Sequence, residues 1–308
     1  MRSSTRSAPP TLKSERSTNP VPATQGEALG WAAGRLGSVG IRESRPESLA
    51  LWGTITKSDP LAALRAARKP MSDDTWERFR DAVERRAEGE PLAYAMGTAG
   101  FRTLDLRVDR RVLIPRPETE GLVQRVLDWA EAEGRHGIVA DIGTGSGCIA
   151  LSLAVEGSFS RVIATDTSAK AMAVAADNAA AVKSDTLVDF RVGEFFEPVR
   201  ETTLDAIVTN PPYVTGGEFE DLDDGVRLYE PRDALVSPEN GMWHIRRILE
   251  DAMDHLNPGG LLVLEVDARR ADPAIDIAGR NGWSAKIEKD VFDRPRYLLC
   301  NPAHGGNV

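Results

Sequence analysis

The chain has 308 residues, of which 41% are hydrophobic, and its formal net charge is −9. This length and apolar content predict one large globular domain with a smaller one. The sequence has no apolar run of roughly 18 residues or more, which excludes a membrane-spanning helix, and its first residues lack the apolar core of a secretory signal. We therefore expect no membrane partner, no export and a cytoplasmic location.

Charge and cysteine content restrict the partners, the compartment and the metal sites that we expect. Residues 1–100 carry 15 basic against 12 acidic side chains, whereas the rest carry 23 against 35. An acidic main domain argues against a stable nucleic-acid partner, because phosphate contacts depend on clustered Lys and Arg. Two cysteines, Cys148 and Cys300, are too few for a disulfide framework and indicate a reducing compartment. No His/Cys cluster has metal-ligand spacing, so no metal is expected.

The N-terminal third divides into three parts. Residues 1–25 are rich in Ser, Thr, Pro and Arg, which predicts a disordered tail and leaves a targeting segment as the alternative. Residues 26–95 show helical spacing of apolar residues, with Ser72 as a plausible N-cap, and predict a small helical domain. Residues 96–117 predict a hairpin linker, because 101–108 alternate apolar and polar residues and lead to a second strand at 112–115.

Residues 118–308 alternate helix and strand patterns. Helices are predicted near 118–133, 148–155, 168–182, 242–256 and 273–279, and strands at 138–141, 162–165, 188–192, 206–209, 261–266, 285–291 and 296–300. This alternation indicates an α/β fold, in which a mostly parallel sheet is covered by helices on both faces. Ligands of such folds bind beyond the carboxyl ends of the strands.

A glycine-rich loop, Asp141-Ile-Gly-Thr-Gly-Ser-Gly147, follows the first of these strands and opens a helix. Its spacing is G-x-G-x-G after an acidic residue, whereas the dinucleotide fingerprint is G-x-G-x-x-G. Glycine permits a tight turn and lets a ligand approach the backbone closely. We predict that Gly143, Thr144, Gly145, Ser146 and Gly147 bind S-adenosylmethionine, with a structural turn as the alternative.

Two further positions lie at strand ends. Asp166 ends the second strand, 25 positions after Asp141, where a carboxylate can accept hydrogen bonds from both ribose hydroxyls. The alternative is an Asp that caps the next helix, a role for which Ser168 competes. Phe195 follows the third strand, and its ring can pack on adenine or belong to the core.

The tetrapeptide Asn210-Pro211-Pro212-Tyr213 follows the strand at 206–209. An amide nitrogen is a poor nucleophile because its lone pair is delocalised into the carbonyl. The Asn210 side-chain oxygen and the Pro211 carbonyl can accept its two N–H groups and orient it, while the prolines fix the backbone and Tyr213 packs on the planar group. This predicts methylation of an amide or a base amine, with a simple strand-exit turn as the alternative.

Several motifs taken together resemble the HemK/PrmC-type release factor glutamine N5-methyltransferases. They are GEPLAY at 89–94, Phe101, LIPRPETE at 113–120, DIGTGSG at 141–147, Asp166, NPPYV at 210–214 and EPRDAL at 230–235. The resemblance covers about residues 26–301. It departs from the family after Glu265, where an expected Gly is absent, and at 292–297; both departures concern the far edge of the sheet and its loops.

The resemblance implies a Rossmann-like class I methyltransferase fold with a seven-stranded sheet and a helical N-terminal domain that helps to hold the substrate. It implies methyl transfer from S-adenosylmethionine to the glutamine of the GGQ motif in class 1 peptide chain release factors. Cofactor contacts would fall on Gly143 to Gly147, Asp166, Phe195 and Asn210. Substrate and catalytic contacts would fall on Asn210 to Tyr213.

Three other functions stay open. NPPY also occurs in a ribosomal-protein glutamine methyltransferase and in N6-adenine DNA methyltransferases. The acidic main domain argues against DNA. The third is a noncatalytic module that keeps the cofactor fold, and it is disfavoured because a pure binder has no need of acceptors that orient an amide.

Overall fold

The computed structural model describes residues 21–303, which form two compact units, one up to Asp81 and one from Ala82. Much of the predicted N-terminal tail therefore lies outside the described residues. No helix within 21–303 combines the length and the apolar character that crossing a bilayer requires.

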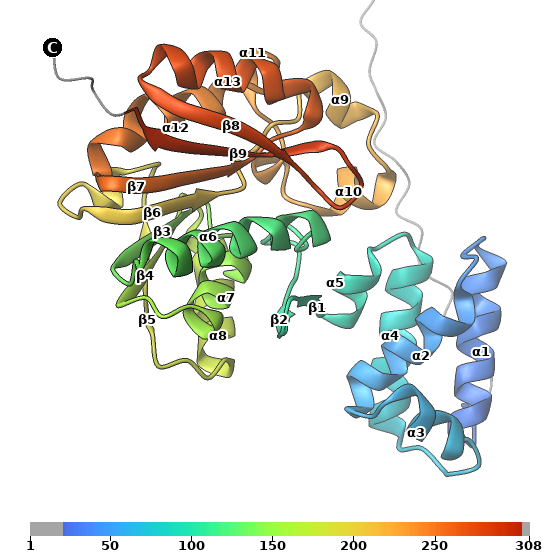
Figure 1. Ribbon diagram of the computed structural model, residues 1–308. Helices are drawn as coiled ribbons and strands as arrows, with labels where there is room; N and C mark the ends of the chain where they lie inside the picture. The colour runs from blue at the N-terminus through green and yellow to red at the C-terminus, as the bar shows by residue number, and fades with distance from the viewer. Residues whose placement is uncertain (1–20, 304–308) are drawn as a thin grey trace, which may run out of the picture. The chain divides into compact units, whose positions relative to one another are not determined.

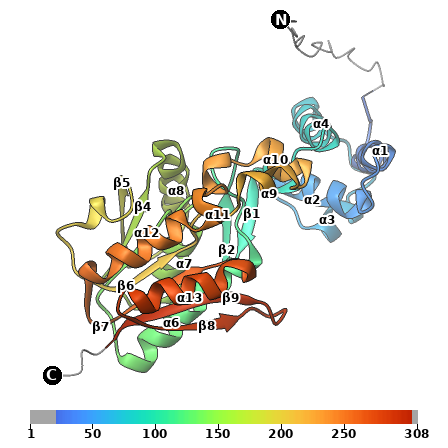
Figure 2. The same cartoon turned by 90° about the horizontal axis from the view of Figure 1, so that it is seen from above.

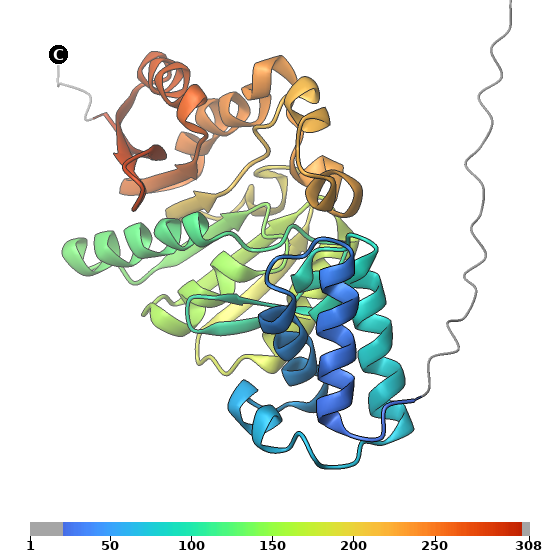
Figure 3. The same ribbon diagram turned by 90° about the vertical axis from the view of Figure 1, so that its right-hand side faces the viewer.

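The first unit is helical, as the apolar spacing predicts. Its helices are α1 (Gln25–Ser38), α2 (Ser44–Thr56), α3 (Pro60–Arg65) and the first part of α4 (Asp73–Ala87). Thr24 and Glu27 form a capping box at the start of α1, and the Ser72 hydroxyl accepts a hydrogen bond from the Thr75 N–H, which confirms Ser72 as a cap. Edge-to-face aromatic pairs, Trp31 with Trp76 and Trp52 with Phe79, join α4 to α1 and α2. The ribbons of α1 and α4 run side by side (Figure 3).

The second unit contains a seven-stranded sheet with the strand order β5-β4-β3-β6-β7-β9-β8. The parallel strands are β3 (Ile138–Ile142), β4 (Arg161–Asp166), β5 (Leu187–Val192), β6 (Leu204–Thr209) and β7 (Leu256–Glu265). The antiparallel pair β8 (Trp283–Lys289) and β9 (Pro295–Pro302) completes one edge. The predicted mostly parallel sheet is confirmed.

Helices cover both faces of this sheet (Figures 1 and 2). On one face α6 (Glu120–Glu133), α7 (Cys148–Glu156) and α8 (Ala169–Ala181) pack on alternate strand residues such as Val139 and Val208. On the other, α12 (Trp243–Asp251) and α13 (Ala271–Arg280) pack on the intervening residues, such as Ala140 and Ile207. Because β6 is buried along its whole length, the loop that follows it starts from a fixed point.

The remaining elements are short. They are α5 (Leu92–Met96), η1 (Pro117–Thr119), η2 (Glu197–Val199), α9 (Gly216–Glu220), α10 (Asp224–Tyr229), η3 (Arg232–Ala234), α11 (Pro238–Gly241), η4 (Ala252–His255) and η5 (Ala268–Arg270). The sequence patterns did not predict α9, α10 and α11, whose four to six residues are too few to show a helical period.

The hairpin exists, but its predicted strands are wrong. The strands are β1 (Thr98–Phe101) and β2 (Leu104–Arg107), and Arg102, with φ +50°, turns the chain where one continuous strand was expected. Residues 112–115 do not form a strand. Their backbone is held instead by side chains, since the Tyr94 hydroxyl donates to the Val112 carbonyl and the Ile114 N–H donates to Glu230.

The far edge of the sheet is intact despite its unusual sequence. The strand predicted at 285–291 is β8, which ends at Lys289. The Asp290 carboxylate then accepts hydrogen bonds from the Phe292 and Arg294 N–H groups and closes the turn into β9. This side chain supplies the turn geometry without a glycine.

Candidate functional site

The glycine loop joins β3 to α7 at the carboxyl edge of the sheet. Gly143 and Gly145 have φ values of +79° and +55°, and a Cβ placed on either would meet open space. Their N–H groups are already used, because Gly143 donates to the Thr165 carbonyl and Gly145 to the Asp166 carboxylate. Glycine therefore leaves an open surface for a ligand, and hydrogen bonds to Thr165 and Asp166 fix the backbone of the loop.

Asp166 holds the loop from the end of β4. One carboxylate oxygen accepts from the Gly145 N–H at 2.9 Å, and the other accepts from the Ser168 N–H at 2.8 Å. The Ser168 hydroxyl itself caps α8 by accepting from the Ala171 N–H. Burial raises the pKa of Asp166, while its two backbone hydrogen bonds oppose that shift.

Asp141, at the start of the loop motif, is fully buried. One of its carboxylate oxygens accepts from the Thr144 hydroxyl at 2.6 Å and from the Ala150 N–H at 3.1 Å, whereas the other has no partner. Burial raises its pKa to about 7, against the effect of these hydrogen bonds. With this pKa, the carboxyl group is about half ionised at neutral pH.

We expect Asp141→Asn to flatten the pH dependence of folding stability. The folded pKa lies above the unfolded value of 3.8, so the stability that this group contributes is fully present below about pH 4 and is lost as pH rises through about 7. The slope from this group is at most roughly 1.4 kcal/mol per pH unit. Urea unfolding at pH 5 and pH 7.5 measures it; an equal pH slope in wild type and variant would contradict the assignment.

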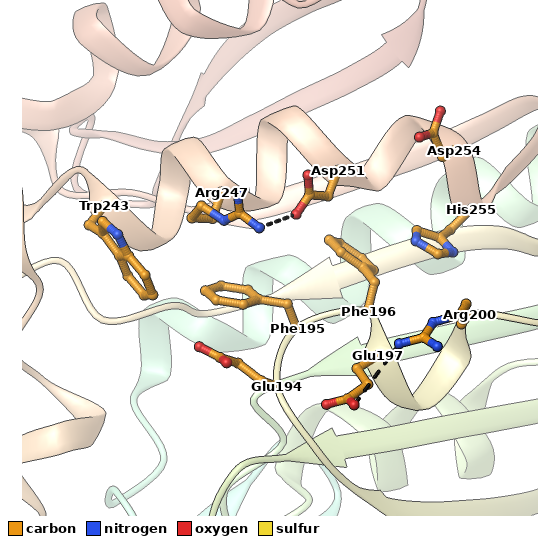
Figure 4. A pocket seen from close by; sticks show the side chains of 10 residues that line it. All are labelled: Glu194, Phe195, Phe196, Glu197, Arg200, Trp243, Arg247, Asp251, Asp254 and His255. Atoms are coloured by element: carbon orange, nitrogen blue, oxygen red, sulfur yellow. Dashed lines mark hydrogen bonds and ion pairs between the residues drawn. The ribbon is translucent and has the colours of Figure 1, made fainter.

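Phe195 lies beyond β5 with φ +46°, an uncommon conformation for a non-glycine residue. Its ring packs on Trp243, with ring centroids 5.4 Å apart, and lines a surface hollow of about 640 Å³ between η2 and α12 (Figure 4). The hollow does not include the glycine loop, Asp166 or NPPY. Its outer part carries charged side chains such as Arg247 and Asp251, which pair with each other.

Asn210 and Tyr213 belong to one buried hydrogen-bond network. The Asn210 Nδ2 donates to the Thr119 Oγ1 at 3.0 Å, and this hydroxyl donates to the Glu265 Oε2 at 2.7 Å. The Tyr213 hydroxyl approaches the Glu265 Oε1 at 3.4 Å. Burial raises the pKa of Glu265, against the effects of the Thr119 hydroxyl and the Arg296 charge. Burial also raises the pKa of Tyr213, which keeps its phenol protonated.

Residues 230–236 hold two segments near NPPY in place: residues 114–116 and the chain at Val214. Glu230 is buried and accepts from the Ile114 N–H at 3.1 Å and from the Arg116 guanidinium at 2.5 Å. Further on, Val214 forms a parallel bridge with Val236. The EPRDAL region thus connects the IPRP turn to the chain just after NPPY.

Gly241 completes this support. Its φ is +83°, and a Cβ there would lie 2.1 Å from the Tyr213 carbonyl oxygen. Only glycine permits this approach without moving the NPPY backbone.

The structure brings most predicted residues to one edge. Gly143 to Gly147 follow β3 and Asn210 follows β6, two neighbouring strands on which Ile142 is opposite Thr209. Asp166 holds the loop, and Phe195 lies further along the edge, beyond β5. The sequence interpretation missed the roles of Thr119, Glu265 and Glu230, although the LIPRPETE and EPRDAL segments and the carboxyl end of β7 were signals for them.

Known proteins resemble the chain over nearly its full length. A family model described as "PrmC N-terminal domain" matches residues 27–97, and one described as "Methyltransferase small domain" matches residues 121–224. A "Release factor glutamine methyltransferase" from Moorella thermoacetica is 40% identical over 279 residues, 89% of this chain and 97% of that protein. One of the same name from Koribacter versatilis is 38% identical over 75% of this chain and 81% of its own length.

Solved structures agree on the fold. The catalytic domain of hMettl16, solved with the MAT2A 3'UTR hairpin 6, aligns with a TM-score of 0.51, 15% identity and coverage of 77% of this chain and 84% of that one. At this identity the likeness supports the class I methyltransferase fold alone.

Proposed function

Since the chain belongs to the release factor glutamine methyltransferase family, we propose that it transfers a methyl group from S-adenosylmethionine to the side-chain amide nitrogen of the glutamine in the GGQ motif of class 1 release factors. The observation that carries the proposal is the pairing of two strand ends. The open glycine loop follows β3, and Asn210 follows the adjacent β6. A methyl donor on the first and an amide on the second would lie next to each other.

The residues of this edge fit S-adenosylmethionine. Gly143 and Gly145 leave space where side chains would otherwise stand, and Asp141 has a buried carboxylate oxygen without a partner. Both Asp166 oxygens already accept one N–H each, and a carboxylate oxygen has a second lone pair for a ribose hydroxyl. When bound, the cofactor supplies an electrophilic methyl group on a sulfonium.

The proposed cofactor contacts are the loop residues, Asp166, Phe195 and Asn210. Phe195 would pack on adenine, since its ring is half-exposed beyond β5 and is already supported by Trp243.

In this proposal, the NPPY residues orient the side-chain amide of the substrate glutamine. The Asn210 side-chain oxygen and the Pro211 carbonyl accept the two N–H groups of the substrate amide, which directs its nitrogen toward the methyl group. Pro212 stiffens the backbone, and the ring of Tyr213 packs on the planar amide. Positioning of this kind raises the rate without a strong base.

The domain assignment follows from the same proposal. Residues 26–95 would help to hold the release factor, 96–117 would link the two domains, and 118–308 would carry the methyltransferase. A cytoplasmic location fits a substrate that acts in translation.

Methyl transfer to an intact release factor tests the function. With radiolabelled S-adenosylmethionine, we expect label on the wild-type factor and none on a GGQ-to-GGA variant, because the variant lacks the accepting nitrogen. Ribosomal protein and DNA in parallel reactions test the two alternative substrates. Equal labelling of GGQ and GGA would refute the glutamine assignment, and no labelling despite cofactor binding would favour a noncatalytic module.

A further inference from the structure

We propose that Thr119 and Glu265 are positioning residues that turn the Asn210 amide so that its oxygen faces the substrate. The inference rests on the proposed function and adds residues outside NPPY to it. An asparagine amide has an acceptor end and a donor end of the same shape, and only the oxygen can receive a substrate N–H. Some part of the protein must therefore decide which end points outward.

The hydrogen bonds from Asn210 to Thr119 and from Thr119 to Glu265 set the orientation of the Asn210 amide. Ionised Glu265, the form that the Thr119 hydrogen bond and the Arg296 charge favour against burial, only accepts. In this form the contact of 2.7 Å between Thr119 Oγ1 and Glu265 Oε2 uses the single proton of the threonine hydroxyl. The hydroxyl oxygen can then only accept from Asn210, and the group at 3.0 Å must be the Nδ2 amine. If the amide were rotated by half a turn, its oxygen would face an oxygen that has no proton to give.

Burial makes this arrangement rigid. Thr119 is 3% exposed and Glu265 is 2% exposed, so water does not replace either partner. The three groups come from separate elements that are fixed independently: Thr119 from η1, Glu265 from the end of β7, and Asn210 from the end of β6. β6 and β7 are neighbours with Thr209 opposite Leu264, which places Asn210 and Glu265 at the next register position.

Glu265 also contacts the tetrapeptide directly. Its Oε1 lies 3.4 Å from the Tyr213 hydroxyl, so one carboxylate is linked to Tyr213 directly and to Asn210 through Thr119. The oxygen on Asn210 and the ring on Tyr213 are therefore set by the same buried group. Their relative placement does not depend on the substrate being bound.

Thr119→Val, Thr119→Ser and Glu265→Gln test the inference with full-length protein and an intact release factor. Valine keeps the shape of threonine but removes the hydroxyl, and we expect kcat to fall about 10- to 100-fold while the cofactor Kd changes less than about threefold. Serine restores the hydroxyl, so activity within about threefold of wild type is expected. In glutamine at 265, the Tyr213 hydroxyl donates to the amide oxygen, which leaves the amine facing Thr119; this reverses the chain and predicts a loss like that of valine.

A double variant separates positioning from general damage. Because Thr119 acts through Asn210, Thr119→Val combined with Asn210→Ala should be no slower than Asn210→Ala alone. Thr186→Val is the matched control, since it removes a half-buried hydroxyl that is bonded to the Phe159 carbonyl just before β5, outside the hydrogen-bond network of Asn210. We expect it to lower the melting temperature and leave kcat within about threefold of wild type.

The outcomes distinguish this inference from the proposed function. Full activity of Thr119→Val with an active wild type would overturn the inference alone, as would multiplicative losses in the double variant. If valine prevents folding, Glu265→Gln decides by the same readouts. A wild-type protein that labels no release factor would overturn both.

Discussion

Replacing Asn210 with alanine is expected to lower methyl transfer about 100- to 1000-fold, the range found when one preorganised hydrogen-bonding group is removed from an active site. The substitution deletes an acceptor that orients a weakly nucleophilic amide. Affinity for S-adenosylmethionine should change less than about threefold, since the glycine loop and Asp166 stay in place. Single-turnover transfer and isothermal titration measure the two quantities separately.

Asn301→Ala is the matched control for this change. Asn301, on β9, is also half-buried, and its side-chain amide donates to the Gly260 carbonyl of β7 at 3.0 Å. It should lose stability of about 1 kcal/mol, with transfer unaffected. If Asn210→Ala abolished cofactor binding instead, Asn210 would be chiefly a cofactor ligand and its proposed catalytic role would be wrong.

Gly145→Ala is expected to weaken S-adenosylmethionine binding about 10- to 100-fold. The new Cβ would enter the open space above the loop, where we propose that the cofactor lies, and alanine at φ +55° adds backbone strain of about 1 kcal/mol. Titration of the cofactor and thermal unfolding of the free protein separate the steric effect from the strain.

Gly134→Ala provides the comparison for strain alone. Gly134 caps the end of α6 with φ +61°, and a Cβ there also meets open space, but it lies outside the glycine loop. Both variants should lose similar stability, and only Gly145→Ala should lose affinity. Equal cofactor binding by the two variants would show that the space above Gly145 is not the cofactor site.

The helices and strands of the sheet were predictable because each has a strong local pattern. The segment 206–209 begins with three apolar residues and lies in the buried strand β6, and the Ser168 side chain caps the start of α8. The hairpin failed for a physical reason: its alternating pattern is compatible with either one strand or two short paired strands. The left-handed conformation of Arg102 separates β1 from β2, and arginine is not a residue type that predicts such a turn.

The sequence by itself determined the fold class, the glycine loop at 143–147 and the NPPY tetrapeptide at a strand end, since each depends on neighbouring residues and their spacing. Only the tertiary structure joined Asn210 to Thr119, 91 positions away, and Thr119 to Glu265, 146 positions away. Such pairings follow from strand order and the packing of η1, which carry no local periodicity. The types of chemical group were therefore set locally, whereas the direction in which the Asn210 amide points was decided by long-range contacts.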